Sequence, residues 1–401
     1  MDTPLHEDSF LVGHATHPDA RMALALAAAQ VDAQAARRPA GARPPSLGLV
    51  YFSDHYAAQA QALHDELHTR WPGVRWAGCA AVGVAASGVE YFDEPALVIM
   101  LCPLPVDDFQ VFSGTQPLGG GAHTALVHAD PSTPDLSEIV VELSQRVATG
   151  YLFGGLVSSR AGATQLAEGV FDGGLSGVGF GAGVALVSRV TQGCQPVGPE
   201  RVVTAAEGPL VLALDGRPAL PCLLEDLGIG LEDPRKVMPV LRATLVGLTD
   251  ADAALLGRGG QFGPDVRARH LIGLDPARQA VAVAEHVAPG MRLAFSQRHT
   301  EAARRDLVRI CSEIREEVES AAEPAGDADG GRPTAARRIL GAVYVSCNGR
   351  GGPHFGAPSA ELKIVQRALG DVPLVGFFAA GEIARSHVYG YTGVLTVFTS
   401  A

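Results

Sequence analysis

Three stretches of the chain repeat one order of elements, and this repeat limits the possible folds more than any other feature. Each stretch predicts a strand, a polar loop, a helix, a second strand with an internal glycine, and a closing strand. The first strands read SLGLVYFSDH at 46–55, HTALVHADP at 123–131 and GAVYVSCNGR at 341–350. The internal glycines are Gly78, Gly154 and Gly376, and we expect them at equivalent backbone positions.

Strand–helix–strand order usually gives two parallel strands joined by a right-handed crossover. The added closing strand makes each sheet mixed. The repeat therefore predicts an α/β fold with mixed, partly parallel sheets built from repeated strand-helix-strand units.

The stretch from 217 to 299 departs from the repeat. Three apolar runs there, at 268–276, 279–287 and 291–298, are separated by turn residues and predict a three-stranded meander. A chain of 401 residues suggests two or three domains. We therefore divide it into an N-terminal helix and linker (1–45), a first domain (46–216) and a second domain (217–401).

A glycine-rich run at 177–183, GVGFGAG, precedes the apolar run VALVS. A dinucleotide-binding fingerprint has to open a helix, so this run predicts a bulged or closely packed strand instead.

Composition limits the partners and the compartment. A formal net charge of −12 argues against nucleic acid or an anionic membrane as the main partner. The six cysteines form no CxxC pair and are sparse, which predicts reduced thiols rather than a zinc site or a disulfide scaffold. No run of about 18 apolar residues and no basic leader is present, so we expect no membrane span and a cytoplasmic location. We expect no cofactor and no metal site.

The segment VSCNGRGGPHFG at 345–356 follows an apolar strand and is the strongest candidate for a site. It has more glycines than a tight turn needs, which indicates a backbone that approaches a ligand or a facing loop closely. Ligands of such sheets bind at the carboxyl ends of the strands.

Longer stretches resemble the FIST family. The segment 193–220, from GCQPVG to GRPAL, resembles the end of the FIST N-terminal domain. VYVSCNGRG at 343–351, PLVGFFAAGEI at 373–383 and YGYTGVL at 389–395 resemble the FIST C-terminal domain. The resemblance covers the chain from about Ser46 to Phe398.

This resemblance implies a sensory module for small ligands, with amino acids as candidates. Such modules occur in bacterial proteins, alone or fused to signalling modules, and in eukaryotic F-box proteins. The chain would then be a cytosolic signal-transduction sensor that binds a small polar ligand and acts through a signalling protein partner. The family's N-terminal domain commonly has Gly-Glu where this chain has Gly83-Val84, whereas Gly381-Glu382 keeps the pair. We therefore place the ligand site in the C-terminal domain.

A zwitterionic ligand needs a guanidinium or backbone N–H groups for its carboxylate and a carboxylate for its ammonium, and Arg350 and Glu382 could supply these. Alternatively, Arg350 and Glu382 pair with each other and tie two loops together. The runner-up function is an enzyme with Cys347 as nucleophile and His354 as base, and a third is a protein-interaction scaffold. We assign no catalytic residue. The candidate ligand-binding residues are Cys347, Asn348, Gly349, Arg350, Gly351, Gly376, Gly381 and Glu382.

Overall fold

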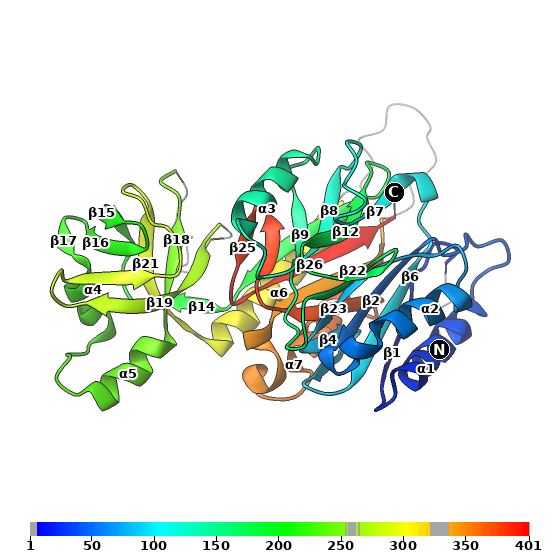
Figure 1. The fold of residues 1–401 in the computed structure, drawn as a ribbon, viewed down its shortest axis with the longest axis horizontal. Helices are drawn as coiled ribbons and strands as arrows, with labels where there is room; N and C mark the ends of the chain where they lie inside the picture. Colours follow the sequence, from blue (N-terminus) through cyan, green and yellow to red (C-terminus); the bar gives the residue numbers. More distant parts are fainter. Residues whose placement is uncertain (1–5, 253–254, 256–261, 264, 321–336, 401) are drawn as a thin grey trace. The chain divides into compact units, whose positions relative to one another are not determined.

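The computed structural model describes residues 6–252, 255, 262–263, 265–320 and 337–400, which form two compact units (Figure 1). One unit draws on the chain up to 190, on 307–388 and on the residues from 392; the other comprises 191–306 and 389–391. Both contain helices and strands, which confirms an α/β protein of two domains. The sequence boundaries at 45 and 216 stay a prediction.

The first unit consists of three repeats. Repeat 1 contains β1 (Leu11–Thr16), α1 (Ala20–Ala35), β2 (Leu47–Ser53), η1 (Asp54–Gln59), α2 (Ala60–Arg70), β3 (Arg75–Ala81), β4 (Gly83–Ala86), β5 (Val89–Phe92) and β6 (Ala96–Cys102). Repeat 2 contains η2 (Val106–Asp108), β7 (Phe109–Phe112), β8 (Thr124–Ala129), α3 (Leu136–Gln145), β9 (Leu152–Leu156), β10 (Thr164–Ala167), β11 (Val170–Asp172) and β12 (Leu175–Phe180). Repeat 3 contains β13 (Leu186–Gln192), α6 (Thr300–Ser320), β22 (Ile339–Cys347), η3 (Asn348–Arg350), η4 (Gly352–Phe355), α7 (Ala360–Leu369), β23 (Leu374–Ala379), β24 (Glu382–Arg385), β25 (His387–Tyr389) and β26 (Thr392–Thr399).

The three repeats exchange hairpins in a cycle. Each sheet holds four strands of one repeat and the two-stranded hairpin of another: β1-β6-β2-β3 continues into β10-β11, β7-β12-β8-β9 into β24-β25, and β13-β26-β22-β23 into β4-β5. Repeat 2 therefore extends the sheet of repeat 1, repeat 3 that of repeat 2, and repeat 1 that of repeat 3. This exchange ties the three repeats into one unit.

The internal glycines are equivalent, as predicted. Each lies in the second strand of a parallel pair, where Gly78 faces Val50, Gly154 faces Val127 and Gly376 faces Tyr344. A Cβ at any of the three would overlap the carbonyl oxygen of the facing residue. The repeat keeps glycine there because no side chain fits between the paired strands.

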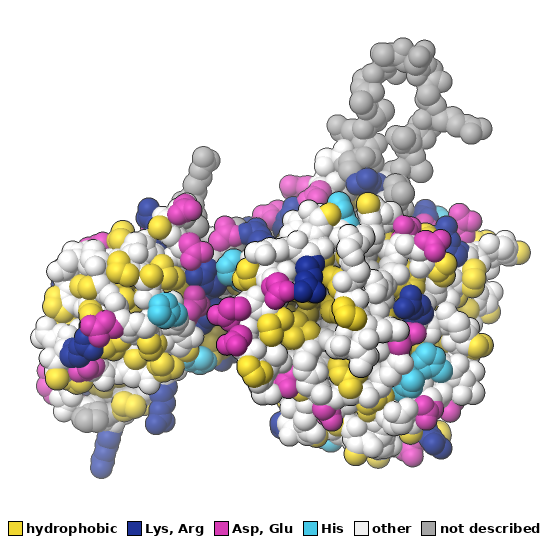
Figure 2. All heavy atoms as spheres, turned by 45° about the horizontal axis from the view of Figure 1, so that its top comes forward, with side chains coloured by type: hydrophobic (Ala, Val, Ile, Leu, Met, Phe, Trp, Pro, Cys, Tyr) yellow, Lys and Arg dark blue, Asp and Glu magenta, His cyan; other side chains and the backbone are white. Residues whose placement is uncertain are grey.

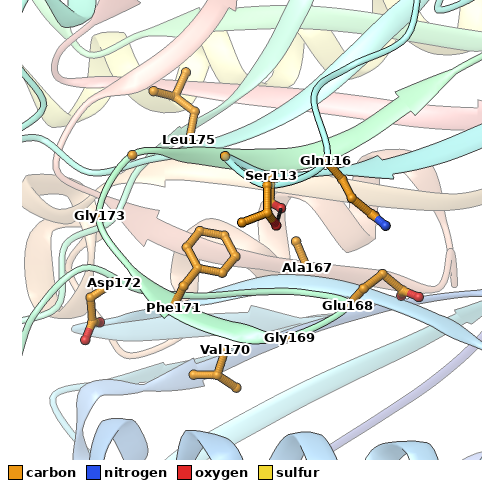
Figure 3. Close-up of a pocket in the computed structure, with 13 residues that line it drawn as sticks. Ser113, Gln116, Ala167, Glu168, Gly169, Val170, Phe171, Asp172, Gly173 and Leu175 are labelled. Carbon is orange, nitrogen blue, oxygen red and sulfur yellow. Dashed lines mark hydrogen bonds between the residues drawn. The ribbon is translucent and has the colours of Figure 1, made fainter.

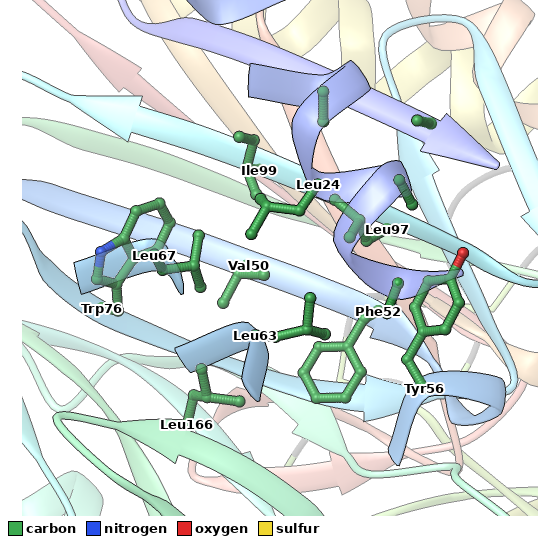
Figure 4. Close-up of a cluster of buried hydrophobic side chains, with 14 of the residues drawn as sticks. Leu24, Val50, Phe52, Tyr56, Leu63, Leu67, Trp76, Leu97, Ile99 and Leu166 are labelled. Carbon is green, nitrogen blue, oxygen red and sulfur yellow. The ribbon is translucent and has the colours of Figure 1, made fainter. Parts of the chain in front are cut away.

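Helices cover the outer faces of the sheets. In repeat 1, α1 and α2 pack on β2, β3 and β6, and Leu24 of α1 meets Leu97 and Ile99 in a hydrophobic core (Figure 4). Asp19 caps α1 by accepting a hydrogen bond from the backbone N–H of Met22 at 2.9 Å. In repeat 3, α6 and α7 cover β22, β23 and β26 in the same way. The buried stripe of α6 is Leu307, Ile310, Cys311, Ile314 and Val318.

Repeat 2 differs from the other two because it has one covering helix, α3, instead of two. Residues 113–123, all of them described, join β7 to β8 without helix or strand. The glycine-rich strand β12 explains how residues 113–123 can pack on the sheet where the other repeats have a second covering helix. Gly179 lies under Leu118 and Ala122, and a Cβ there would overlap the Leu118 side chain. Residues 177–180 of the run thus belong to a closely packed strand, as predicted, whereas 181–183 lie in the turn that follows it.

The second unit is a separate antiparallel structure. It contains β14 (Cys194–Pro196), β15 (Arg201–Glu207), β16 (Leu210–Leu214), β17 (Arg217–Pro218), α4 (Ala219–Leu227), α5 (Pro234–Ala243), β18 (Thr244–Thr249), β19 (Arg267–Asp275), β20 (Ala280–Val283) and β21 (Arg292–Arg298). The predicted meander is correct for β19 and β20, which pair, but wrong for β21. β21 pairs with β14, β15 and β18 instead, so the sheet closes on itself rather than ending in an edge.

Candidate functional site

The predicted loop begins where β22 ends. Cys347 is the last residue of β22 and is 6% exposed, whereas Asn348 is exposed and Gly349 half-buried. Gly351 is buried, and a Cβ there would overlap the ring of Phe92 from the β4–β5 hairpin of repeat 1. The close approach that the glycines predicted is therefore made to the exchanged hairpin.

Arg350 is buried in an ion pair that the sequence analysis did not identify. Its side chain is 1% exposed, and its Nε and Nη2 atoms both donate to Oε1 of Glu361, at 2.9 and 2.6 Å. Glu361 lies in the first turn of α7. The partner of Arg350 is thus Glu361 and not Glu382, which was the partner expected for a loop tie. The guanidinium also lies over the ring of Phe355, 5.2 Å from its centroid.

Glu361 connects this ion pair to β22. Its Oε1 accepts a hydrogen bond from Tyr344 Oη at 2.7 Å, and its Oε2 accepts one from Ser346 Oγ at 3.0 Å. Burial, together with the charge of Glu361, raises the pKa of Tyr344. Arg350, Glu361, Tyr344 and Ser346 therefore form one buried polar network behind the strand end.

A second carboxyl group closes this network from repeat 1. Glu90 of β5 accepts hydrogen bonds at Oε1 from the backbone N–H groups of Glu361 (3.1 Å) and Leu362 (3.3 Å), at the start of α7. Burial and then the charge of Glu361 raise the pKa of Glu90 to about 7. Glu90 could not be found from the sequence, because it reaches α7 through the hairpin exchange.

Glu382 is fully buried at the start of β24. Its Oε2 accepts hydrogen bonds from the backbone N–H and Oγ1 of Thr392, at 3.1 and 2.6 Å. Burial raises the pKa of Glu382 to about 8, although the bonds from Thr392, the charge of Arg350 and the nearby Cys347 thiol all act to lower it. The Cys347 thiol and the charge of Arg350 thus both act on the Glu382 carboxyl group.

Strand register identifies the residues equivalent to Glu382. Glu382 faces Gly155, Val84 faces Phe377 and Gln165 faces Cys79, and each facing residue directly follows one of the three internal glycines. Val84 thus takes the place of Glu382 in repeat 1, as the sequence analysis stated. Gln165 is also buried and bonds to the carbonyl oxygens of Gly173 and Gly174.

Two polar atoms of this cluster lack partners. Among the described residues, Nη1 of Arg350 and Oε1 of Glu382 are buried and make no hydrogen bond. Such atoms are rare in folded proteins because an unpaired buried polar group is costly. Gly376 lies inside β23, and the carbonyl oxygen of Gly381 accepts a hydrogen bond from Leu156 N at 2.7 Å, so these two candidate residues build the backbone around the cluster.

A different buried pair lies between the sheets. Tyr51 Oη and His128 Nε2 are 3.2 Å apart, and the ring of Phe377 stands 5.0 Å from Tyr51 and 5.7 Å from His128. Burial lowers the pKa of His128 to about 3, and its Nδ1 has no partner among the described residues. The imidazole is therefore neutral at ordinary pH.

A cavity of about 530 Å³ lies in repeat 2, between the β10–β11 hairpin and residues 113–116. The ring of Phe171 occupies its middle, with Ser113 and Gln116 opposite, and Glu168 and Asp172 at either end of the hairpin (Figure 3). The volume is within the usual range for small-molecule sites. This cavity and the Arg350 cluster are separate candidates, since they share no residue.

The chain is an α/β protein of three repeats that exchange hairpins. In the sequence, the antiparallel unit is inserted between β13 and β22. Repeat 3 contains a buried polar cluster. The chain belongs to the FIST family: the FIST N domain matches residues 46–217 and the FIST C domain residues 219–385. FIST domains are associated with sensing in signal transduction. None of the helices in the described part is both long and apolar enough to cross a membrane.

Similar proteins occur in mycobacteria. Uncharacterized protein Rv0628c of Mycobacterium tuberculosis is 32% identical over 407 residues, covering 96% of this chain and 98% of the relative. Uncharacterized protein Mb0898c of Mycobacterium bovis is 31% identical over 410 residues, with the same coverage of both chains. Both alignments therefore span nearly the whole length of this chain and of each relative.

Proposed function

We propose that the chain is a cytoplasmic sensory protein in which repeat 3 binds a small polar molecule. The candidate residues are those from Cys347 to Gly351 together with Gly376, Gly381 and Glu382. One observation supports this most: Nη1 of Arg350 and Oε1 of Glu382 are both buried and meet no geometric hydrogen-bond partner among the described residues, and the charge of Arg350 acts on the Glu382 carboxyl group. Asn348 and Ala380, which follow β22 and β23, are exposed, so the cluster lies directly beneath the surface.

The chemistry of these two atoms favours a ligand with an acceptor oxygen. With a pKa of about 8, Glu382 carries a proton at neutral pH. Its Oε2 already accepts two hydrogen bonds from Thr392, so the proton belongs on Oε1. Oε1 and Nη1 are then both donors. A carboxylate or carbonyl oxygen placed between them would satisfy both, which fits one end of an amino acid or of another polar metabolite.

The first test is a thermal-shift screen of carboxylate-containing metabolites, because a ligand that binds the folded state raises the apparent stability. Calorimetric titration of the best ligand then compares Glu382→Val with Glu382→Gln. Valine is the residue at the equivalent place in repeat 1 and removes the donor, so we expect affinity to fall by roughly 0.5–1.5 kcal/mol or more. Glutamine keeps a donor and should bind nearly as well as the unaltered protein.

Equal affinities in all three proteins would contradict a site at Glu382. The cavity around Phe171 provides the comparison. A ligand that loses affinity in Phe171→Ala but not in Glu382→Val binds in repeat 2, and the site proposed here is then wrong.

A second candidate function, an enzyme with Cys347 as nucleophile, is favoured by the position of the Cys347 thiol beside the Glu382 carboxyl group. Labelling by a thiol reagent across pH measures how readily Cys347 ionises. Labelling that is lost in Cys347→Ser, has a midpoint well below about 8.5 and accompanies turnover of an ester would support the enzyme. Labelling without turnover would leave Cys347 as a wall of the ligand site.

A further inference from the structure

Repeat 2 has an apolar groove where the other two repeats have a helix. The groove runs beside α3, has a volume of about 270 Å³ and is lined by Phe112, Pro117, Leu118, Ile139, Leu143 and Leu175, with Glu142 and Arg146 also on its wall. We call it the α3 groove. Ile139, Glu142 and Leu143 of α3 and its C-cap residue Arg146 are spaced i, i+3, i+4 and i+7, so they form one stripe.

The equivalent face of repeat 1 is covered by α1. Strand register makes Gly13 of β1 equivalent to Phe112 of β7, because Gly13 faces Ile99 and Phe112 faces Gly177 in the corresponding closing strands. A Cβ at Gly13 would overlap the backbone of Ala27 in α1. The helix therefore lies directly on that position in repeat 1. In repeat 3, α6 packs on Val187 of β13 and on Leu395 in the same way.

Segment 113–123 of repeat 2 fills only part of this space. Leu118 and Ala122 are buried against Gly179, and Gln110 holds the segment through Gly119 N (3.0 Å) and Pro117 O (3.2 Å). Beside it, Ile139 and Leu175 are half-buried and Glu142 and Arg146 are exposed, whereas Leu143 is buried against the core. On the face of the molecule drawn in Figure 2, hydrophobic side chains are interspersed with charged and other polar groups.

Arg146 occupies a position that contacts the second covering helix in the other two repeats. Arg70, Arg146 and Ala368 each lie eight residues before the internal glycine of their repeat. In repeat 1, Arg70 of α2 reaches across to Asp32 of α1, at 3.6 Å. In repeat 3, the carbonyl oxygen of Ala368 in α7 accepts a hydrogen bond from Arg315 of α6. Arg146 instead pairs with Glu142 on its own helix and lines the groove.

We infer that the α3 groove docks an amphipathic helix of another protein. That helix places apolar side chains at i, i+3, i+4 and i+7 against Ile139, Leu143 and Leu175, and offers a carboxylate to Arg146, as α1 offers Asp32 to Arg70. The proposal does not depend on the small-molecule site. It gives the sensor a surface through which a signalling partner can bind.

The test begins with a photo-crosslinking amino acid at position 142, with position 141 as the matched control. Val141 is 40% exposed and, two residues from Ile139, it points away from the groove stripe. A crosslinked partner segment, identified by mass spectrometry, is then synthesised and its binding measured by fluorescence anisotropy. We expect crosslinking from position 142 only, to a segment with helical apolar spacing that becomes helical on binding.

Binding of the synthesised peptide to variants of the full chain then tests whether the peptide occupies the α3 groove. Ile139→Asp and Arg146→Glu should each weaken the peptide at least tenfold, while Val141→Asp leaves its affinity unchanged. Replacing the acidic residue of the peptide by arginine should restore binding to Arg146→Glu. Melting curves confirm that each variant is folded. No crosslink, a crosslink only to a second copy of this chain, or a peptide that binds Ile139→Asp and Val141→Asp equally would overturn the proposal.

Discussion

Nε and Nη2 of Arg350 converge on one oxygen, Oε1 of Glu361, which also accepts a hydrogen bond from Tyr344. All three side chains are almost completely buried. A buried ion pair contributes modestly as a pair, but removing one partner leaves an uncompensated charge in the interior. The stability of the folded protein should therefore depend strongly on Glu361, which lies outside the loop that contains Arg350.

We predict that Glu361→Gln lowers the free energy of unfolding by about 3–5 kcal/mol. Urea unfolding followed by tryptophan fluorescence measures this in the first unit, because Trp71 and Trp76 are the two tryptophans of the chain. The control is Arg146→Ala, which breaks an exposed pair with Glu142 and should cost about 1 kcal/mol or less. Similar losses in the two variants would show that the buried pair has no special role.

A second prediction concerns the equivalent glycines. Gly376→Ala should destabilise the first unit by about 1–3 kcal/mol or more, because its Cβ would overlap the carbonyl oxygen of Tyr344 and the paired strands would have to separate. Gly114→Ala is the matched control, since a Cβ there meets no atom within 4 Å. The same urea experiment compares them. An unaffected Gly376→Ala protein would mean that the strand pair can adjust.

The repeat was readable from the sequence because each copy changes from strand to helix spacing at the same place and keeps one glycine. Gly78, Gly154 and Gly376 could therefore be aligned without a structure. The covering helix α6 shows the limit, because the second unit separates it from β13 by more than a hundred residues. Its position as the counterpart of α1 is visible only in three dimensions.

The candidate site was predicted in part for a similar reason. Cys347, Arg350 and Glu382 lie at or just after the carboxyl ends of the parallel strands β22 and β23, where ligands of such sheets bind, and their role in binding stays a prediction. Glu361 and Glu90 were missed because neither has a local signal. Glu361 looks like an ordinary acidic residue at a helix start, and Glu90 arrives from repeat 1 through a strand pairing that no local pattern encodes.

A third prediction follows from Glu382, whose pKa is raised to about 8 in the folded protein from an ordinary value of 4.5. Between these values the folded state binds a proton that the unfolded state has lost. The resulting stabilisation is complete below about pH 4.5 and is lost as the pH rises through 8. Glu382→Gln should flatten this decline, by at most about 1.4 kcal/mol per pH unit.

Urea unfolding at intervals between pH 5 and 8.5 measures that slope. Glu138→Gln, a change of an exposed carboxyl group on α3, serves as the control and should leave it unaltered. Glu90 also has a raised pKa, of about 7, so part of the decline should remain in Glu382→Gln. Identical slopes in the unaltered protein and Glu382→Gln would show that Glu382 is ionised in the folded state.

The last prediction concerns His128, which should make the protein less stable as the pH falls rather than as it rises. Its pKa falls to about 3 in the folded protein because burial disfavours the imidazolium, against an ordinary value of 6.5. Below pH 6.5 the unfolded state therefore binds a proton that the folded state does not, and stability falls as the pH drops toward 3. His128→Gln should reduce the acid slope between pH 6.5 and 4, by up to about 1.4 kcal/mol per pH unit. His123→Gln, at an exposed position of the same repeat, should keep the slope of the unaltered protein. If both variants lose stability toward acid as steeply as the unaltered protein, His128 is not held neutral between the sheets.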